Sequence, residues 1–160
     1  MKFLPTLGIA LVLAGCSVPT QRTVSIGESQ EAVRARLGSP ATERKLASGD
    51  RAWYFVTAPS GFFTWQAVFD RDGRVTEYVQ VLTRQNFDSL PQGASRDLVL
   101  DRLGPPMERS TFKRTATEAW TYRWKDGTFE MLANALFRAD GGGLIQVTLG
   151  RDPAFDSPAR

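Results

Sequence analysis

The sequence of 160 residues contains no histidine and only one cysteine. Without histidine, the chain has neither a Ser-His-Asp triad nor a metal site with imidazole ligands. A single cysteine excludes a disulfide within the chain and the grouped thiolates of structural zinc sites. Stability must therefore come from packing, for which four Trp and ten Phe are present. We expect no metal, no cofactor and no catalytic residue.

Long hydrophobic runs are also missing, since no stretch after Leu13 reaches the roughly 18 apolar residues that span a bilayer. One shorter run, from Phe3 to Leu13, follows a positively charged start and has the length of a signal-peptide core. Leu13-Ala14-Gly15-Cys16 then resembles the bacterial lipobox, in which the cysteine is acylated and the preceding segment removed. The resemblance implies a lipid anchor at Cys16, and Ser17 after it implies sorting to the outer membrane, facing the periplasm. A plain secretory signal with an incidental thiol is the alternative.

Charge of one sign does not dominate, because 20 Lys and Arg residues are interspersed with 17 Asp and Glu residues. The net charge of +3 falls to about +2 when Lys2 leaves with the signal segment. A nucleic-acid groove needs clustered cations, which this pattern does not provide. We therefore expect no nucleic-acid partner.

An internal repeat is the main sign of architecture. The residues Gly27, Ser29, Val33, Leu37, Gly38 and Pro40 recur 66 positions later as Gly93, Ser95, Val99, Leu103, Gly104 and Pro106. The offset becomes 67 at Trp53 and Trp120, then 68 at Phe69 and Phe137. We predict two tandem units at residues 24–83 and 84–150. They follow a signal peptide at 1–15 and a lipidated tether at 16–23, and a disordered tail at 151–160 comes last.

Each unit is expected to contain a short helix followed by an antiparallel sheet of three to four strands, an α+β fold. Ser29 and Ser95 are typical N-caps, while Gly38 and Gly104 are suited to the left-handed conformation after a helix end. Alternating apolar residues then indicate strands joined by Gly- and Asp-rich turns. The expected strands are residues 43–46, 52–57, 62–70 and 74–82 in the first unit, and 119–124, 128–138 and 144–149 in the second, with an earlier one near 110–113.

The sequence resembles a known family in three features: the repeated pattern Gly-x-Ser-x-x-x-Val-x-x-x-Leu-Gly-x-Pro, an aromatic strand around Trp53, and the segment from Phe69 to Val75. These features are similar to those of the SmpA/OmlA family of BamE-like outer-membrane lipoproteins, and the lipobox fits that family too. Two tandem helix-plus-sheet units also resemble the architecture of β-lactamase inhibitor proteins. Because the matching residues are mainly those that build the fold, the resemblance is more specific for fold than for function.

Aromatic residues without a repeated counterpart are the candidate partner-binding residues: Tyr54, Phe62, Phe63, Tyr78 and Trp124. Tyr54 alternates with Trp53 and Phe55, so it should face outward if those two face the helix. Exposed aromatics suit protein binding, although each of the five could instead cover the edge of the core. Trp53 and Trp120 are expected to anchor the core of each unit. Asp70 and Asp72 are interpreted as turn residues rather than a catalytic pair.

The sequence thus predicts a non-catalytic protein-binding or scaffold module attached to the outer membrane. The short tether after Cys16 implies a partner at or near that membrane. The family resemblance implies the β-barrel assembly machinery or envelope integrity as candidate contexts. The alternative is an inhibitor or regulator of a periplasmic enzyme. A hydrolase of cell-wall material is a third class, for which no catalytic signature is present.

Overall fold

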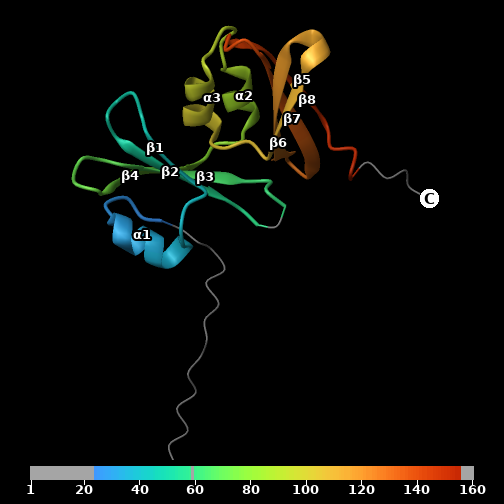
Figure 1. Cartoon of the computed structure of the whole chain (residues 1–160). Coiled ribbons are helices and arrows are strands. Elements are labelled where there is room, and N and C mark those ends of the chain that lie inside the picture. The colour runs from blue at the N-terminus through green and yellow to red at the C-terminus, as the bar shows by residue number, and fades with distance from the viewer. Residues whose placement is uncertain (1–23, 59, 156–160) are drawn as a thin grey trace, which may run out of the picture.

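The computed structural model describes residues 24–58 and 60–155, which form an α+β fold with two four-stranded antiparallel sheets (Figure 1). Each sheet is a meander in which neighbouring strands are consecutive in sequence, so every connection is a hairpin. The predicted α+β class, with short helices and antiparallel sheets, is confirmed. Helix and sheet are arranged in the same order in both halves of the chain.

The first half contains helix α1 (Gln30–Leu37) followed by the first sheet. Its strands are β1 (Thr42–Lys45), β2 (Arg51–Val56), β3 (Thr64–Phe69) and β4 (Val75–Gln80). The second half begins with two helices, α2 (Arg84–Asp88) and α3 (Arg96–Leu103). The second sheet consists of β5 (Glu108–Phe112), β6 (Thr117–Asp126), β7 (Phe129–Arg138) and β8 (Leu144–Arg151), with a single 3-10 turn at Lys113–Thr115.

The helix boundaries follow from local capping. The Ser29 hydroxyl accepts a hydrogen bond of 3.3 Å from the amide of Ala32, and the Ser95 hydroxyl accepts one of 3.1 Å from Leu98. Both helices end at a glycine with positive φ, 83° at Gly38 and 75° at Gly104. The predicted N-caps and C-terminal glycines are therefore confirmed.

Each sheet has its own aromatic core. Trp53 packs on Phe69 and Trp120 packs on Phe137, in both cases with ring centroids 4.7 Å apart. The two tryptophans are 3% and 1% exposed, which agrees with their expected role as anchors. Val33 of α1 closes the first core from the helix side.

The interpretation of Asp70 as a turn residue is confirmed. Asp70 Oδ1 accepts hydrogen bonds from the amides of Asp72 and Arg74, at 3.0 and 2.8 Å. Gly73, at φ 72°, completes the reversal between β3 and β4. The carboxylate of Asp70 is thus used to fix a turn.

Two elements differ from expectation. Helix α2 was not predicted, because five residues are too few for an amphipathic pattern to show in the sequence. The tail predicted from residue 151 is wrong for residues 151–155. Arg151 ends β8, the buried Asp152 carboxylate pairs with Arg123 at 2.7 Å, and Phe155 packs on Phe62.

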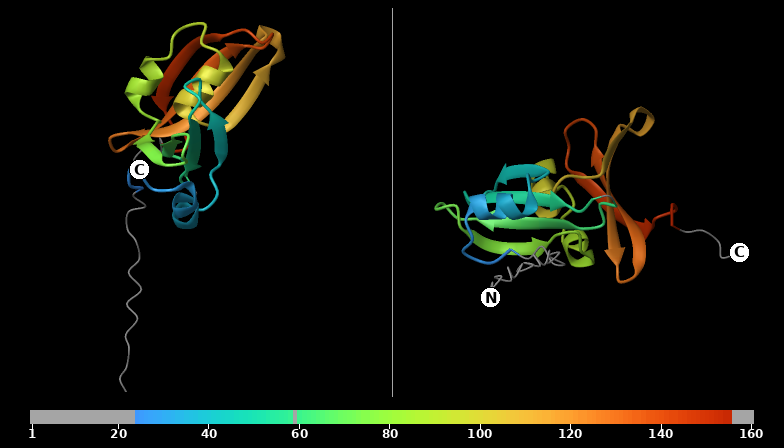
Figure 2. Two further views of the ribbon diagram at one scale, coloured as in Figure 1. Left: turned by 90° about the vertical axis from the view of Figure 1, so that its left-hand side faces the viewer. Right: turned by 90° about the horizontal axis from the view of Figure 1, so that it is seen from below.

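The helices form separate layers around the first sheet. Helix α1 covers one face of this sheet, while α2 and α3 lie between its other face and the second sheet (Figures 1 and 2). Helix α3 therefore contacts two sheets. Val99 and Leu103 enter the core of the second sheet, and Asp101 contacts residues of the first. The first sheet is covered on both faces as a result.

Candidate functional site

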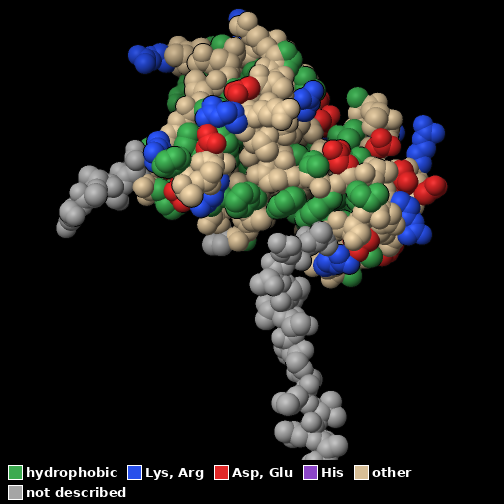
Figure 3. Space-filling model, turned by 180° about the vertical axis from the view of Figure 1, so that it is seen from behind, with side chains coloured by type: hydrophobic (Ala, Val, Ile, Leu, Met, Phe, Trp, Pro, Cys, Tyr) green, Lys and Arg blue, Asp and Glu red, His purple; other side chains and the backbone are tan. Residues whose placement is uncertain are grey.

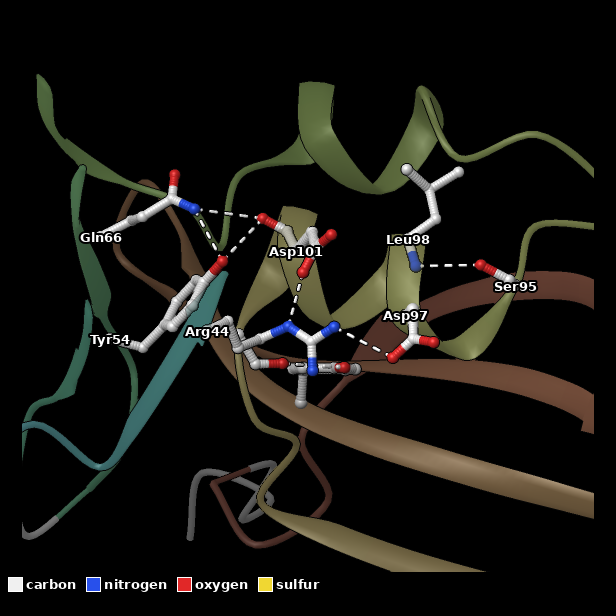
Figure 4. Close-up of polar contacts among 9 residues, drawn as sticks. Arg44, Tyr54, Gln66, Ser95, Asp97, Leu98 and Asp101 are labelled. Atoms are coloured by element: carbon white, nitrogen blue, oxygen red, sulfur yellow. Dashed lines mark hydrogen bonds and ion pairs between the residues drawn. The ribbon is translucent and has the colours of Figure 1, made fainter. Parts of the chain in front are cut away.

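The junction between the halves is a polar network around α3, drawn in Figure 4. The Tyr54 hydroxyl donates a hydrogen bond of 2.9 Å to the main-chain carbonyl of Asp101. Gln66 Nε2 donates to the same carbonyl at 3.1 Å and to the Tyr54 oxygen at 2.7 Å. Arg44 of β1 pairs with the carboxylates of Asp101 and, at 3.0 Å, Asp97. One face of the first sheet is thereby joined to α3.

Burial sets the electrostatics of this junction. It raises the pKa of Tyr54 to about 12, with a smaller opposing effect from the hydrogen bond of Gln66. Burial lowers the pKa of Arg44, but hydrogen bonds to Asp101 and Asp97 outweigh it, so the pKa is raised overall. The network therefore consists of a neutral phenol, which is hydrogen-bonded to a main-chain carbonyl, and an arginine paired with two carboxylates. Because these polar groups bind one another, we interpret the network as a structural contact.

A close approach of the backbone completes the junction. A Cβ atom added to Gly104 would lie 2.7 Å from Cδ1 of Tyr54 and 3.1 Å from Cγ2 of Thr64. The equivalent glycine of α1, Gly38, has no heavy atom within 4 Å of such a Cβ. Position 104 thus requires a glycine for two reasons, the positive φ of its backbone and its close contact with the first sheet.

The expectation that Tyr54 and Trp124 face outward is wrong. Tyr54 is fully buried because α3 docks on the sheet face that was taken to be free. Trp124 is 1% exposed because Phe87 of α2 covers it, with ring centroids 5.1 Å apart. Neither side chain is available to a partner in this arrangement.

The β2–β3 loop holds the next two candidates. Phe62 is buried, which corrects its expected exposure, because it packs against Phe155 at 5.6 Å and lies beneath Lys125 at 5.0 Å. Phe63 is 38% exposed and remains available for contact. The loop therefore uses one of its two aromatics to join the halves.

Tyr78, the remaining candidate, belongs to a site that sequence reasoning did not recognise. Its ring stacks on Trp65, with centroids 5.1 Å apart and an interplanar angle of 14°. Both side chains are half-buried and lie on the α1 face of the sheet, beyond the C-terminal end of the helix. The eight residues of α1 cover Trp53 and Phe69 but do not extend over this end of the sheet.

The described residues around this end of the sheet form a hollow of about 930 Å³, which we call the α1 hollow. Phe55, Trp65 and Tyr78 line it from the sheet, and Leu37 lines it from the end of α1. Val24 contributes from the first described segment, while Ser39 and Ala58 lie among its exposed lining residues. Figure 3 shows a row of apolar side chains across the lower part of one face of the molecule. The feature of the sequence that could have indicated this hollow is the short length of α1 relative to the strands that it covers.

Several charged groups of the second sheet form ion pairs. Arg96 reaches Glu118 at 2.8 Å, and the carboxylate of Glu118 also accepts from the indole of Trp120 at 2.7 Å. Burial would raise the pKa of Glu118, but these hydrogen bonds lower it overall. Among residues 24–58 and 60–155, no three His, Cys, Asp or Glu side chains are grouped so that they could hold a metal ion.

Cys16 lies outside the described residues, so the structure does not place the expected lipid site. No helix in the described part of the chain is long and apolar enough to cross a membrane.

Comparison with known proteins gives only distant similarities. No family model and no curated protein matches the chain. A DUF4309 family protein, YjgB of Bacillus subtilis, is similar at 16% identity and a TM-score of 0.30, over 82% of this chain and 86% of that one. The "putative beta-lactamase inhibitor protein" of Streptococcus mutans is 17% identical at a TM-score of 0.32, over 82% and 88%. Similarity this distant assigns neither a family nor an activity, so the predicted membership of the SmpA/OmlA family stays a prediction.

Proposed function

We propose that the protein is a lipoprotein of the outer membrane that presents a non-catalytic binding module to the periplasm. The observation that carries this proposal is the α1 hollow, an apolar recess with an aromatic wall at one end of the first sheet. Recesses lined by aromatic and aliphatic side chains are typical of binding sites. The lipobox-like segment ending at Cys16 supplies the anchor in this account.

The position of the hollow relative to the anchor supports the same proposal. Val24 lies in the wall of the hollow, and only seven residues, Ser17 to Thr23, separate it from Cys16. Fully extended, such a tether spans at most roughly 25 Å. A lipid at Cys16 would hold the hollow close to the membrane surface, so its partner would be a membrane protein or a protein docked against the membrane.

We further propose that the two halves are copies of one unit, as the SmpA/OmlA resemblance implies. Equivalent serines cap α1 and α3, equivalent glycines end them, and equivalent tryptophans anchor the two cores. The copies would then have separate roles. The second unit docks α3 on the first sheet, and the first unit keeps an open end for a ligand.

Affinity purification from native membranes tests the binding function. The full chain would be compared with Ala58→Trp, which places a large side chain at the hollow, and with Ala47→Trp as a matched control. Ala47 is also an exposed alanine next to a hairpin turn of the first sheet, and it is absent from the lining of the hollow.

We expect a membrane-associated protein to co-purify with the wild type and Ala47→Trp, and to be lost with Ala58→Trp. Recovery of one soluble periplasmic enzyme instead would favour the inhibitor function. Equal recovery with both variants would exclude the hollow as the binding site.

A further inference from the structure

Phe87 occupies the space beside Tyr122 and Trp124 at one end of the second sheet. It projects from α2 and is 1% exposed, between Tyr122 at 6.2 Å and Trp124 at 5.1 Å. Tyr122 follows Trp120 on its strand as Phe55 follows Trp53, so Phe87 covers the region of the second sheet that corresponds to the α1 hollow. In the second half, a short helical turn preceding α3 thus closes this region with one aromatic side chain.

The first half has no equivalent aromatic in its sequence. At the offset of 66 that relates Leu90 to Val24, Phe87 corresponds to Gln21. The seven residues from Ser17 to Thr23 include no aromatic, and their only apolar members are Val18 and Pro19. Val24 lies in the wall of the hollow. The seven residues that precede it in the sequence supply no side chain comparable to Phe87.

The wall of the α1 hollow is itself adapted to an aromatic ligand. Trp65 and Tyr78 stand where the second sheet has the smaller Ala133 and Val147. Their stacked rings narrow the recess but leave about 930 Å³, and they form a flat aromatic surface. An aromatic pair stabilises a contact by more than the burial of its surface area alone would provide. A Phe side chain also loses little rotamer freedom on docking.

We propose that the α1 hollow binds an aromatic side chain, of the Phe type, that a partner protein presents on a short helical turn. The side chain would pack against Phe55 and the Trp65–Tyr78 pair as Phe87 packs against Tyr122 and Trp124 in the second half. This inference rests on the binding function proposed above and names the chemistry of its ligand.

The direct probe is a peptide that copies the α2 segment of this chain, Thr83 to Leu90, with a fluorophore at its N-terminus. The full-length lipoprotein would be held in lipid nanodiscs so that no detergent competes for the hollow. Fluorescence anisotropy should show saturable binding with a Kd of roughly 0.1 to 1 mM, weak because the free peptide must be ordered on binding. The same peptide with Phe87→Ala should bind at least about tenfold more weakly.

Variants of the protein locate the binding. Ala58→Trp and Ser39→Trp each place a large side chain in the lining of the hollow, and each should weaken peptide binding about tenfold or more. Ala47→Trp should leave it unchanged. Thermal midpoints within a few degrees of the wild type would show that all three variants are folded, and agreement between the two blocking variants guards against a local effect of either one.

Three outcomes would overturn the inference. The peptide could show no measurable binding at about 1 mM, or bind equally with and without its phenylalanine. A fluorescent 16-carbon fatty acid could bind in its place, with the same sensitivity to Ala58→Trp, which would make the hollow a site for acyl chains. If the peptide fails while co-purification of a membrane protein still depends on Ala58, the proposed function stands and only the aromatic ligand is refuted.

Discussion

The Tyr54 hydroxyl donates a hydrogen bond of 2.9 Å to the main-chain carbonyl of Asp101, 47 residues later in the sequence. This contact joins the first sheet to a helix whose apolar side belongs to the core of the second sheet. Removing only the hydroxyl, by Tyr54→Phe, leaves Gln66 as the remaining donor to that carbonyl. We expect a loss of about 1 kcal/mol in the free energy of unfolding. Urea unfolding followed by tryptophan fluorescence measures it, and no loss at all would mean that the junction is loose in solution.

Alkaline pH should weaken the same contact. The pKa of Tyr54 is raised to about 12 by burial, whereas an unfolded tyrosine ionises near pH 10. A raised pKa means that the stability contributed by the neutral phenol is complete below about pH 10 and is lost as the pH rises toward 12. The free energy of unfolding should therefore fall across this window.

Tyr54→Phe is the control for the pH effect, because its ring cannot ionise. Its free energy of unfolding should fall less between about pH 10 and 11 than that of the wild type. Tyr122, whose pKa burial also raises, is retained in both proteins and accounts for the shared part of the fall. Parallel pH profiles for the two proteins would contradict the role given to Tyr54.

Gly104 and Gly38 offer a matched pair of substitutions. Both residues combine positive φ with a ψ of −164°, a conformation that is essentially restricted to glycine, so Gly38→Ala should cost about 1 to 3 kcal/mol from backbone strain alone. Gly104→Ala adds a clash with the ring of Tyr54 and should cost roughly 1 to 3 kcal/mol more. Thermal unfolding of both variants decides the matter. Equal costs would show that Tyr54 moves aside without penalty.

The core tryptophans should matter equally in the two halves. Trp53→Ala and Trp120→Ala each remove a buried aromatic that packs on a phenylalanine at 4.7 Å. Each should lower the free energy of unfolding by about 3 to 5 kcal/mol. A change of a degree or less in the midpoint for both variants would be incompatible with their burial.

Attachment to the membrane should depend entirely on Cys16. Cys16→Ala should abolish incorporation of a labelled fatty acid and leave a soluble or unprocessed protein, because no other acyl site is available in a chain with one cysteine. Metabolic labelling and density-gradient fractionation measure both effects. An unlabelled wild type, or label found only in the inner membrane, would contradict the proposed location.

Local signals were sufficient to predict most of the elements. Ser29 with Gly38, and Ser95 with Gly104, mark helix ends through contacts within a few residues, so the sequence alone specifies them. The hairpin turns and the alternation of the strands are local in the same sense. The fold class could therefore be predicted without knowledge of how the halves pack.

The candidate site could not be predicted, because it depends on contacts between distant segments. Tyr54 alternates as an outward residue should, and only the docking of α3 buries it. The burial of Trp124 depends on α2, which is too short to show a helical pattern. The α1 hollow, in turn, results from the length of one helix relative to the strands that it covers, which no single residue encodes.

In-cell photocrosslinking at the α1 hollow tests the central claim most directly. A photoreactive phenylalanine analogue would replace Ser39, whose exposed side chain lies in the lining of the hollow. The same analogue at Ser48, exposed in the distant β1–β2 turn, is the matched control. The account predicts crosslinks to a membrane-associated protein from position 39, their absence from position 48, and their loss from position 39 when Cys16→Ala releases the module. Equal crosslinking from both positions, or none from position 39 in a folded and lipidated protein, would contradict it.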